Sequence, residues 1–269
     1  MLNEKRIKAI IVISLFLIET FVWMVNGSGN SWSLGFIGGS DGPTAIIVGD
    51  GNDRTDEEKP SDSRPDENED LTAALKDARD KGLLILVNKE YPIDREYKPD
   101  DLTKIKYYVP DRAEGTRYMR AEAAEAFHRM VESAALDGVE LKMTTAYRSY
   151  DFQKILFDNY VANEGEEKAN TFSARPGQSE HQTGLAVDVS SPCVDYQLSN
   201  DYGNTTEGKW IENHAHRFGF ILRFPKGKED VTGYQYEPWH LRYVGLAAAK
   251  IIYEKNLTLE EFLQENTVE

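Results

Sequence analysis

The chain contains very little cysteine, and its positive charges are outnumbered. Its 269 residues include a single cysteine, Cys193, so neither an intrachain disulfide nor a thiolate zinc cluster can form. The 31 lysines and arginines stand against 46 aspartates and glutamates, which gives a formal net charge of -15. This excess argues against binding to nucleic acid and against docking onto an anionic lipid surface.

Two kinds of recognisable pattern are also missing from the sequence. No G-x-G-x-x-G or phosphate-binding loop occurs, and no segment repeats with a period of 20–50 residues. Hydrophobic residues make up 40% of the chain, and aromatic residues make up 11% of the chain. That composition is typical of a globular enzyme or binding domain.

The N-terminus carries a membrane signal. Lys5, Arg6 and Lys8 lie at the start of a mostly apolar run from Ile7 to Val25, which spans 19 residues and is interrupted by Glu19. A membrane span needs roughly 20 apolar residues, and no A-x-A cleavage signal follows this run. We therefore predict a single-pass anchor in the cell membrane, with the remaining chain outside the cell. The alternative is a cleaved signal that releases a secreted protein.

Composition divides the chain into an anchor or signal (1–26), a linker (27–69) and a folded domain (70–269). Between Asp50 and Asp70, ten acidic residues stand against three basic ones, with proline, serine and glycine between them. Such a segment buries too little apolar surface to offset its ordering entropy, so we predict a solvated tether.

Hydrophobic periodicity and end signals predict helices and strands that alternate irregularly in the third part. Helices are expected over 71–81, 117–135, 151–163, 209–218, 244–256 and 258–265; strands over 83–88, 140–149, 185–189 and 218–225. The block 171–190 is expected to be an ordered loop that leads into a strand. His128 falls on the apolar stripe of the helix predicted over 117–135, so we expect its side chain to be packed in the core. The fold class predicted is α+β, a small antiparallel sheet flanked by helices and preceded by the membrane helix.

The stretch "SEHQTGLAVDVS" places His181 seven residues before Asp188, with Gly184 and Ala186 between them. Alone, such a pair could be a loop cap and a turn residue. Zinc in a hydrolase typically takes three protein ligands and leaves the fourth position to water. His181 and Asp188 would supply two of them, and the third candidate is His240 in "YEPWHLRY".

Two further residues fit this chemistry. Glu237 precedes His240 by three positions, and Pro238 disfavours a regular helix between them. A carboxylate beside the metal can take the proton from an attacking water. Arg148, in "AYRSYDFQ", lies at a predicted strand-to-helix junction. Its planar guanidinium could stabilise a developing oxyanion, although a surface arginine in a salt bridge is the alternative.

Three motifs in order carry a resemblance to a known family: "AYRS", S-x-H-x-x-G-x-A-x-D from Ser179 to Asp188, and "EPWH" at 237–240. The region from Leu83 to Ile252 resembles the zinc D-alanyl-D-alanine carboxypeptidases of the VanY type, in the group that includes lysostaphin and the hedgehog fold. The resemblance implies one zinc ion per chain, held by His181, Asp188 and His240. It also implies that Glu237 is the catalytic base and that Arg148 binds the carbonyl oxygen.

Four more polar residues are candidates for binding substrate. A carboxypeptidase must bind a terminal carboxylate, which Arg175 or the hydroxyls of Ser173 and Ser179 could do through charge-assisted hydrogen bonds. Gln153, on the helix that follows Arg148, is the fourth. Ordering of the loop is an alternative role for all of them.

The resemblance implies a D,D-carboxypeptidase that removes the terminal D-alanine from peptidoglycan stem peptides by metal-activated water. One alternative is L,D-carboxypeptidase action on tetrapeptide stems, since related enzymes share the metal site. Another is a non-catalytic, zinc-stabilised module that binds the cell wall. Glu237 argues against that module, because a structural zinc needs no free base beside it.

Overall fold

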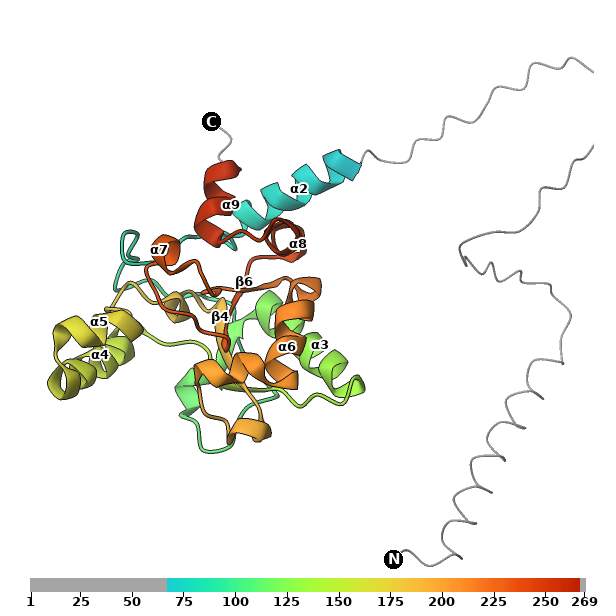
Figure 1. Ribbon diagram of the computed structural model, residues 1–269. Helices are drawn as coiled ribbons and strands as arrows, with labels where there is room; N and C mark the ends of the chain where they lie inside the picture. The colour runs from blue at the N-terminus through green and yellow to red at the C-terminus, as the bar shows by residue number, and fades with distance from the viewer. Residues whose placement is uncertain (1–66, 267–269) are drawn as a thin grey trace, which may run out of the picture. The chain divides into compact units, whose positions relative to one another are not determined.

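The computed structural model describes residues 67–266, which form a four-stranded antiparallel sheet with helices around it (Figure 1). The strand order is β3 (Lys142–Thr145), β4 (Ala186–Ser190), β6 (His240–Tyr243) and β5 (Phe220–Leu222). A separate two-stranded antiparallel sheet joins β1 (Leu102–Lys104) to β2 (Tyr118–Arg120). The predicted small antiparallel sheet with flanking helices is thus confirmed.

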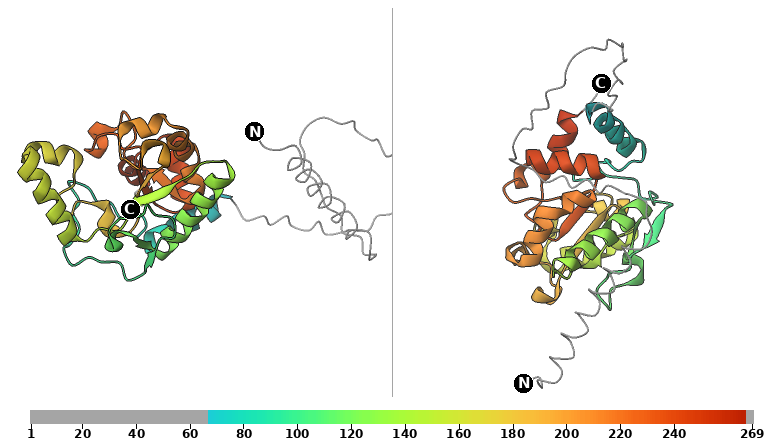
Figure 2. Two further views of the ribbon diagram at one scale, coloured as in Figure 1. Left: turned by 90° about the horizontal axis from the view of Figure 1, so that it is seen from below. Right: turned by 90° about the vertical axis from the view of Figure 1, so that its right-hand side faces the viewer.

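Eight α-helices surround these sheets in the described range: α2 (Glu67–Asp80), α3 (Ala121–Leu136), α4 (Tyr150–Glu164), α5 (Glu166–Phe172), α6 (Thr206–His214), α7 (Glu229–Thr232), α8 (Leu246–Lys255) and α9 (Leu259–Glu265). Five short 3-10 helices complete the list: η1 (Glu114–Thr116), η2 (Glu180–Thr183), η3 (Pro192–Val194), η4 (Asn200–Asn204) and η5 (Ala215–Phe218). Helices α4 and α5 lie side by side at one end, apart from the other helices (Figure 2).

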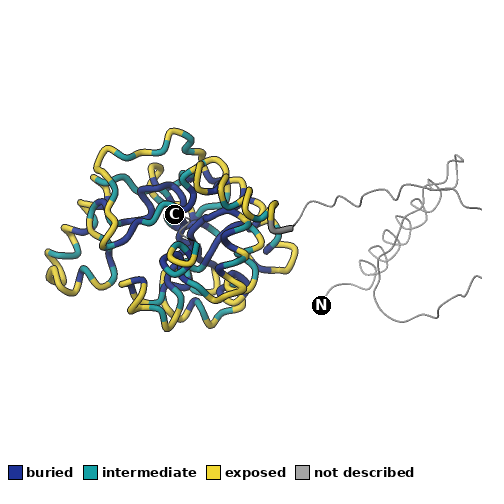
Figure 3. Tube along the Cα trace, turned by 90° about the horizontal axis from the view of Figure 1, so that it is seen from above, coloured by how far each residue is buried: buried dark blue, intermediate teal, exposed yellow. Residues whose placement is uncertain are grey.

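The two faces of the four-stranded sheet have different roles. Successive side chains of a strand point to opposite faces. Val187 of β4 and Leu241 of β6 therefore point to one face, where they join the hydrophobic core together with Phe127 of α3. Asp188 and His240 point to the other face. Buried stretches run through the middle of the domain in Figure 3, whereas α4 and α5 are largely exposed.

The predicted strand over 83–88 is wrong. This segment has no strand partner, although Leu83 and Val87 are buried. The backbone carbonyls of Leu83 and Ile85 instead accept hydrogen bonds from the Arg242 guanidinium, at 2.9 and 2.7 Å. A buried carbonyl needs a donor, and here a side chain supplies the donor that a neighbouring strand would otherwise provide.

Several predicted boundaries also shift. The helix predicted over 117–135 begins at Ala121, because Tyr118–Arg120 pairs with β1 as a strand. The first helix starts at Glu67, four residues before its predicted start, and the beginning of the predicted loop 171–190 belongs to α5. His128 is packed as predicted: it is buried, and its Nε2 accepts a hydrogen bond from the backbone of Lys106.

No helix among residues 67–266 is long and apolar enough to cross a membrane. The predicted membrane anchor (1–26) and residues 27–66 of the predicted linker lie outside the described residues.

Candidate active site

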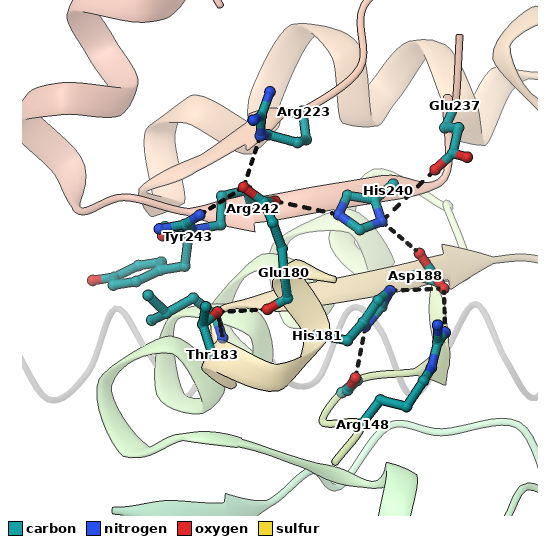
Figure 4. A network of polar contacts seen from close by, with 12 residues as sticks. Arg148, Glu180, His181, Thr183, Asp188, Arg223, Glu237, His240, Arg242 and Tyr243 are labelled. Atoms are coloured by element: carbon teal, nitrogen blue, oxygen red, sulfur yellow. Dashed lines mark hydrogen bonds and ion pairs between the residues drawn. The ribbon is translucent and has the colours of Figure 1, made fainter. Parts of the chain in front are cut away.

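Three buried side chains meet on one face of the four-stranded sheet (Figure 4). His181 comes from η2, Asp188 from β4 and His240 from β6. Asp188 Oδ2 lies 3.3 Å from His181 Nε2, and Asp188 Oδ1 lies 3.1 Å from His240 Nδ1. One potential ligand atom from each residue lies within 4.8 Å of the others. The structure thus brings together the three residues predicted to bind zinc.

Strand register and one glycine produce this arrangement. Asp188 and His240 are direct partners in the antiparallel pairing of β4 with β6, so their side chains point to the same face. Gly184 has a φ of 68°, which turns the chain from η2 into β4 and returns His181 to Asp188. A Cβ at this position would also lie 3.0 Å from a methyl carbon of Leu102. Gly184 is therefore needed for both its conformation and its size.

Hydrogen bonds select which nitrogen of each histidine faces the centre. His181 Nδ1 donates to the backbone carbonyl of Ala146 at 2.6 Å, which leaves the Nε2 lone pair free to face Asp188. In His240 the roles are reversed, since Nδ1 faces Asp188 while Nε2 faces Glu180 Oε2 at 3.5 Å. Ordering of histidine ligands by a partner on the other ring nitrogen is usual in metal sites.

The charges of this cluster suit a cation. Burial would raise the pKa of the Asp188 carboxyl, but the imidazoles of His181 and His240 hold that pKa well below its ordinary value. Burial lowers the pKa of His181 and would lower that of His240, yet the adjacent carboxylates of Asp188 and Glu180 raise the His240 pKa to about 9. Asp188 Oδ1 is buried without a hydrogen-bond donor among the described residues. Two imidazole nitrogens and one carboxylate fit a catalytic zinc site.

Glu237 lies beside these ligands and is not one of the three. It precedes β6 in a turn with Pro238, and its Oε2 is 3.8 Å from His240 Nδ1. Burial raises the pKa of the Glu237 carboxyl to about 7, with the positive charge of His240 acting in the opposite direction. A nearby metal cation would also favour the ionised form. This position suits a general base.

Arg148 lies between β3 and α4, where the sequence predicted a junction. Its Nη2 is 3.9 Å from Asp188 Oδ2, and its Nη1 donates to Gln153 Oε1 at 2.7 Å. The amide nitrogen of Gln153 in turn donates to the backbone carbonyl of Ala174 at 2.6 Å and to Ser173 Oγ at 3.4 Å. Both polar ends of Gln153 are therefore engaged within the protein, and Gln153 holds Arg148 in place.

A cavity of about 360 Å³ opens onto the cluster. Only two of the four predicted substrate-binding residues line this cavity. Ser173 and Ser179 line it, whereas Gln153 is buried beneath Arg148. Arg175 is not part of the cavity lining; it is exposed, pairs with Glu166 at 2.7 Å and lies over the Phe157 ring. The apolar part of the lining is formed chiefly by these residues: Leu156, Tyr160, Phe172, Phe224 and Trp239.

The sequence reasoning missed a buried group of charged residues behind His240. Glu180 accepts hydrogen bonds from Arg223 and Arg242, and Arg223 also pairs with Glu260. A signal was present, since Arg223 and Arg242 stand inside the apolar stretches "FILRF" and "HLRY". Arginine is almost never fully buried unless it is paired.

Comparisons with known proteins agree with this geometry. The family model described as VanY, D-alanyl-D-alanine carboxypeptidase, matches residues 116–246. The putative carboxypeptidase YodJ of Bacillus subtilis (strain 168) is 47% identical over 186 residues, which cover 68% of each chain. The D-alanyl-D-alanine carboxypeptidase of Enterococcus faecium is 35% identical over 189 residues, covering 68% of this chain and 58% of that one.

Solved structures show the same relationship. The LD-carboxypeptidase LdcB has 48% sequence identity and a TM-score of 0.65, over 68% of this chain and 86% of that one. A mutant of the vancomycin resistance D,D-pentapeptidase VanY, in complex with Zn(II), has 33% identity and a TM-score of 0.57, over 67% and 98% of the two chains. Zinc is accordingly the cofactor that fits His181, Asp188 and His240. The chain belongs to the VanY family of D-alanyl-D-alanine carboxypeptidases, and it is a metallopeptidase that acts as a carboxypeptidase on peptidoglycan peptides.

Proposed function

We propose that this enzyme is an L,D-carboxypeptidase, which removes the terminal D-alanine from tetrapeptide stems of peptidoglycan. The observation that carries the proposal is the greater similarity to the LD-carboxypeptidase LdcB, at 48% identity and a TM-score of 0.65. The D,D-active VanY structure is 33% identical with a TM-score of 0.57. An L,D-carboxypeptidase DacB, at 36% identity and a TM-score of 0.53, supports the same reading.

The D,D-carboxypeptidase activity expected from the motifs is the second candidate. The matching family model and the Enterococcus faecium relative are both described as D-alanyl-D-alanine carboxypeptidase. The two activities differ in the residue that precedes the scissile bond, and both need the same metal ligands, base and oxyanion donor.

The protein groups divide the hydrolysis between them. When bound, zinc supplies a Lewis acid that polarises the scissile carbonyl and lowers the pKa of water. Glu237 takes a proton from the attacking water as the new carbon–oxygen bond forms, and it delivers that proton to the amine nitrogen as the carbon–nitrogen bond breaks. Arg148 donates to the carbonyl oxygen as negative charge develops there. The products are a shortened peptide and free alanine, and no covalent enzyme intermediate is needed.

The cavity lining supports the binding of a peptide end. The hydroxyls of Ser173 and Ser179 lie in the same cavity as Arg148 and Glu237, and we assign to them the binding of the terminal carboxylate. Arg175 lies outside this cavity lining, so its contribution would be to hold α5 through Glu166.

Digestion of purified stem peptides tests the proposal. The zinc-loaded enzyme should release one alanine from a tetrapeptide stem and leave a pentapeptide stem intact, as seen by mass spectrometry with and without a chelator. Release of one alanine from the pentapeptide alone would replace the proposal with D,D activity. Binding to isolated cell walls without cleavage of either peptide would favour the non-catalytic module.

We also propose that the domain acts outside the cell, tethered to the membrane. The support is the sequence alone: the basic and apolar N-terminal segment and the acidic linker that follows it. Protease added to intact cells should cut within 49–70 and release an active soluble domain. A domain protected from protease until the cells are lysed would contradict this location.

A further inference from the structure

A buried network of four charged side chains lies next to the metal ligand His240, and Figure 4 shows three of them, Glu180, Arg223 and Arg242. It contains Glu180, Arg223, Arg242 and Glu260, whose side chains are 2%, 0%, 0% and 10% exposed. Glu180 comes from η2, Arg223 follows β5, Arg242 belongs to β6 and Glu260 to α9. Four separate elements therefore meet at one point next to the active site.

The two oxygens of Glu180 have different partners. Oε1 accepts hydrogen bonds from Arg223 Nε at 2.8 Å and from Arg242 Nη1 at 2.7 Å. Oε2 faces His240 Nε2 at 3.5 Å, and both atoms are buried without a hydrogen-bond partner among the described residues. The carboxylate is thus held by two guanidinium groups while its second oxygen faces the imidazole.

The arginines are fixed by further contacts. Arg223 makes two hydrogen bonds to Glu260, at 2.6 and 2.9 Å, and Arg242 donates to the carbonyls of Leu83 and Ile85. Two positive and two negative charges balance within the network. Glu180 is therefore an ionised acceptor in a fixed position, and a fixed acceptor favours a proton on the nitrogen that faces it.

The strand register explains why the network reaches His240. His240 and Arg242 are two residues apart on β6, so both side chains point to the same face. Opposite them on β4 lie Asp188 and Ala186. Arg242 therefore lies on the same side of the sheet as the metal ligands, where its guanidinium donates to Glu180 Oε1.

We infer that Glu180 is a positioning residue for the metal: it keeps the His240 proton on Nε2, so that the Nδ1 lone pair faces zinc. The arginine network holds Glu180 in place for this purpose. In His181 the proton is held on Nδ1 instead, because Nδ1 donates to the backbone carbonyl of Ala146 and Nε2 is left to face the metal. The inference rests on the metal site of the proposed function and is independent of which stem peptide is cut.

Glu180→Gln is the sharpest variant for a test. The two arginines are donors, so they retain the amide oxygen and leave the amide NH₂ group facing His240 Nε2. A donor in that place favours the tautomer with its proton on Nδ1, which cannot bind zinc. We expect zinc affinity to fall about 10–100-fold, as is usual when a partner of a metal ligand is changed. Competition with a chromophoric chelator measures this without any substrate.

Glu260→Gln is the matched control, because it removes one negative charge from the same network without touching His240. It should lower the thermal unfolding temperature of the metal-free protein and leave zinc affinity within about twofold of the unchanged protein. Equal loss of affinity in Glu180→Gln and Glu260→Gln would overturn the inference, since the effect would then be a general loss of structure. Unchanged affinity in Glu180→Gln would overturn it as well.

Nitrogen-15 NMR of histidine in the zinc-loaded, unmutated protein gives a second measurement that needs no variant to fold. His240 should show a proton on Nε2 and a metal-shifted Nδ1, and Glu180→Gln should weaken or remove this signature. A proton on Nδ1 in the zinc-loaded protein would refute the inference. Because neither measurement involves peptide hydrolysis, failure of the stem-peptide assay would not affect the result.

Discussion

Asp188 and His240 are direct partners across two hydrogen-bonded strands, and Asp188 Oδ1 lies 3.1 Å from His240 Nδ1. The pairing of β4 with β6 fixes the separation of these two ligands before any metal binds. His181 joins them through a turn whose left-handed residue is Gly184. The site is therefore carried by regular backbone and not by a mobile loop, which favours the precise geometry that a metal ligand set requires.

The ligand set predicts the zinc content of variants. The unmutated protein should hold about one zinc ion per chain. His181→Ala or His240→Ala should abolish that zinc, and Asp188→Ala should weaken it, because the carboxylate both binds the metal and offsets its charge. His214, which lies on α6 and stacks on Trp210, offers a control histidine away from the site. Elemental analysis of dialysed protein measures the zinc content of each variant. Full zinc content in all three ligand variants would contradict the proposed metal site.

Glu237→Ala separates chemistry from metal binding. Since Glu237 lies beside the ligands and 3.8 Å from His240 Nδ1, the variant should keep its zinc and its fold. General-base catalysis contributes about 10²–10⁴-fold, so the turnover should fall by at least that factor. Zinc content and steady-state rate on one stem peptide are measured together. Loss of zinc along with activity would make Glu237 a ligand, and retention of both would refute its role as the base.

The motifs predicted the site better than the periodicity predicted the fold. His181, Asp188, His240, Glu237 and Arg148 all meet around one cavity, as expected from residue chemistry and order along the chain. Strand 83–88 was predicted wrongly because an apolar run indicates burial and not the source of its hydrogen bonds. Here Arg242, 159 residues away from Leu83, supplies them.

The buried arginine network was out of reach for a similar reason. The apolar stretch around Arg223 signals its burial, but its partners Glu180 and Glu260 lie far from it in the sequence, and each of them alone reads as a surface charge. Their burial follows only from the packing of η2, β5 and α9 around one point. Arg175 was predicted to bind substrate because it lies close to a metal-binding motif in the sequence. In the structure it lies outside the cavity lining and pairs with Glu166.

Buried ion pairs of this network should contribute more to the free energy of unfolding than exposed ion pairs do. Glu260→Gln removes one of the two carboxylates that pair with Arg223 and leaves the buried network with a net positive charge, so we expect a loss of about 3–5 kcal/mol in the free energy of unfolding. Asp158→Asn, which breaks the exposed pair of Lys154 with Asp158, should leave the unfolding midpoint almost unchanged. Urea denaturation of the metal-free protein measures both. Equal midpoints for the two variants would show that burial of the network adds nothing to stability.

Arg148 tests whether the guanidinium polarises the carbonyl or only supports the ligands. It lines the cavity, and its Nη2 lies 3.9 Å from Asp188 Oδ2. Arg148→Ala should keep the metal and lose about 10²–10³-fold in turnover, as for other oxyanion donors. Arg148→Lys should recover only part of this loss, because a point charge on a flexible stem does not reproduce the planar fork that Gln153 holds. Zinc content beside kcat and KM is measured for each variant. A zinc content that falls in parallel with the rate would mean that Arg148 supports Asp188, and an unchanged kcat would remove it from the mechanism.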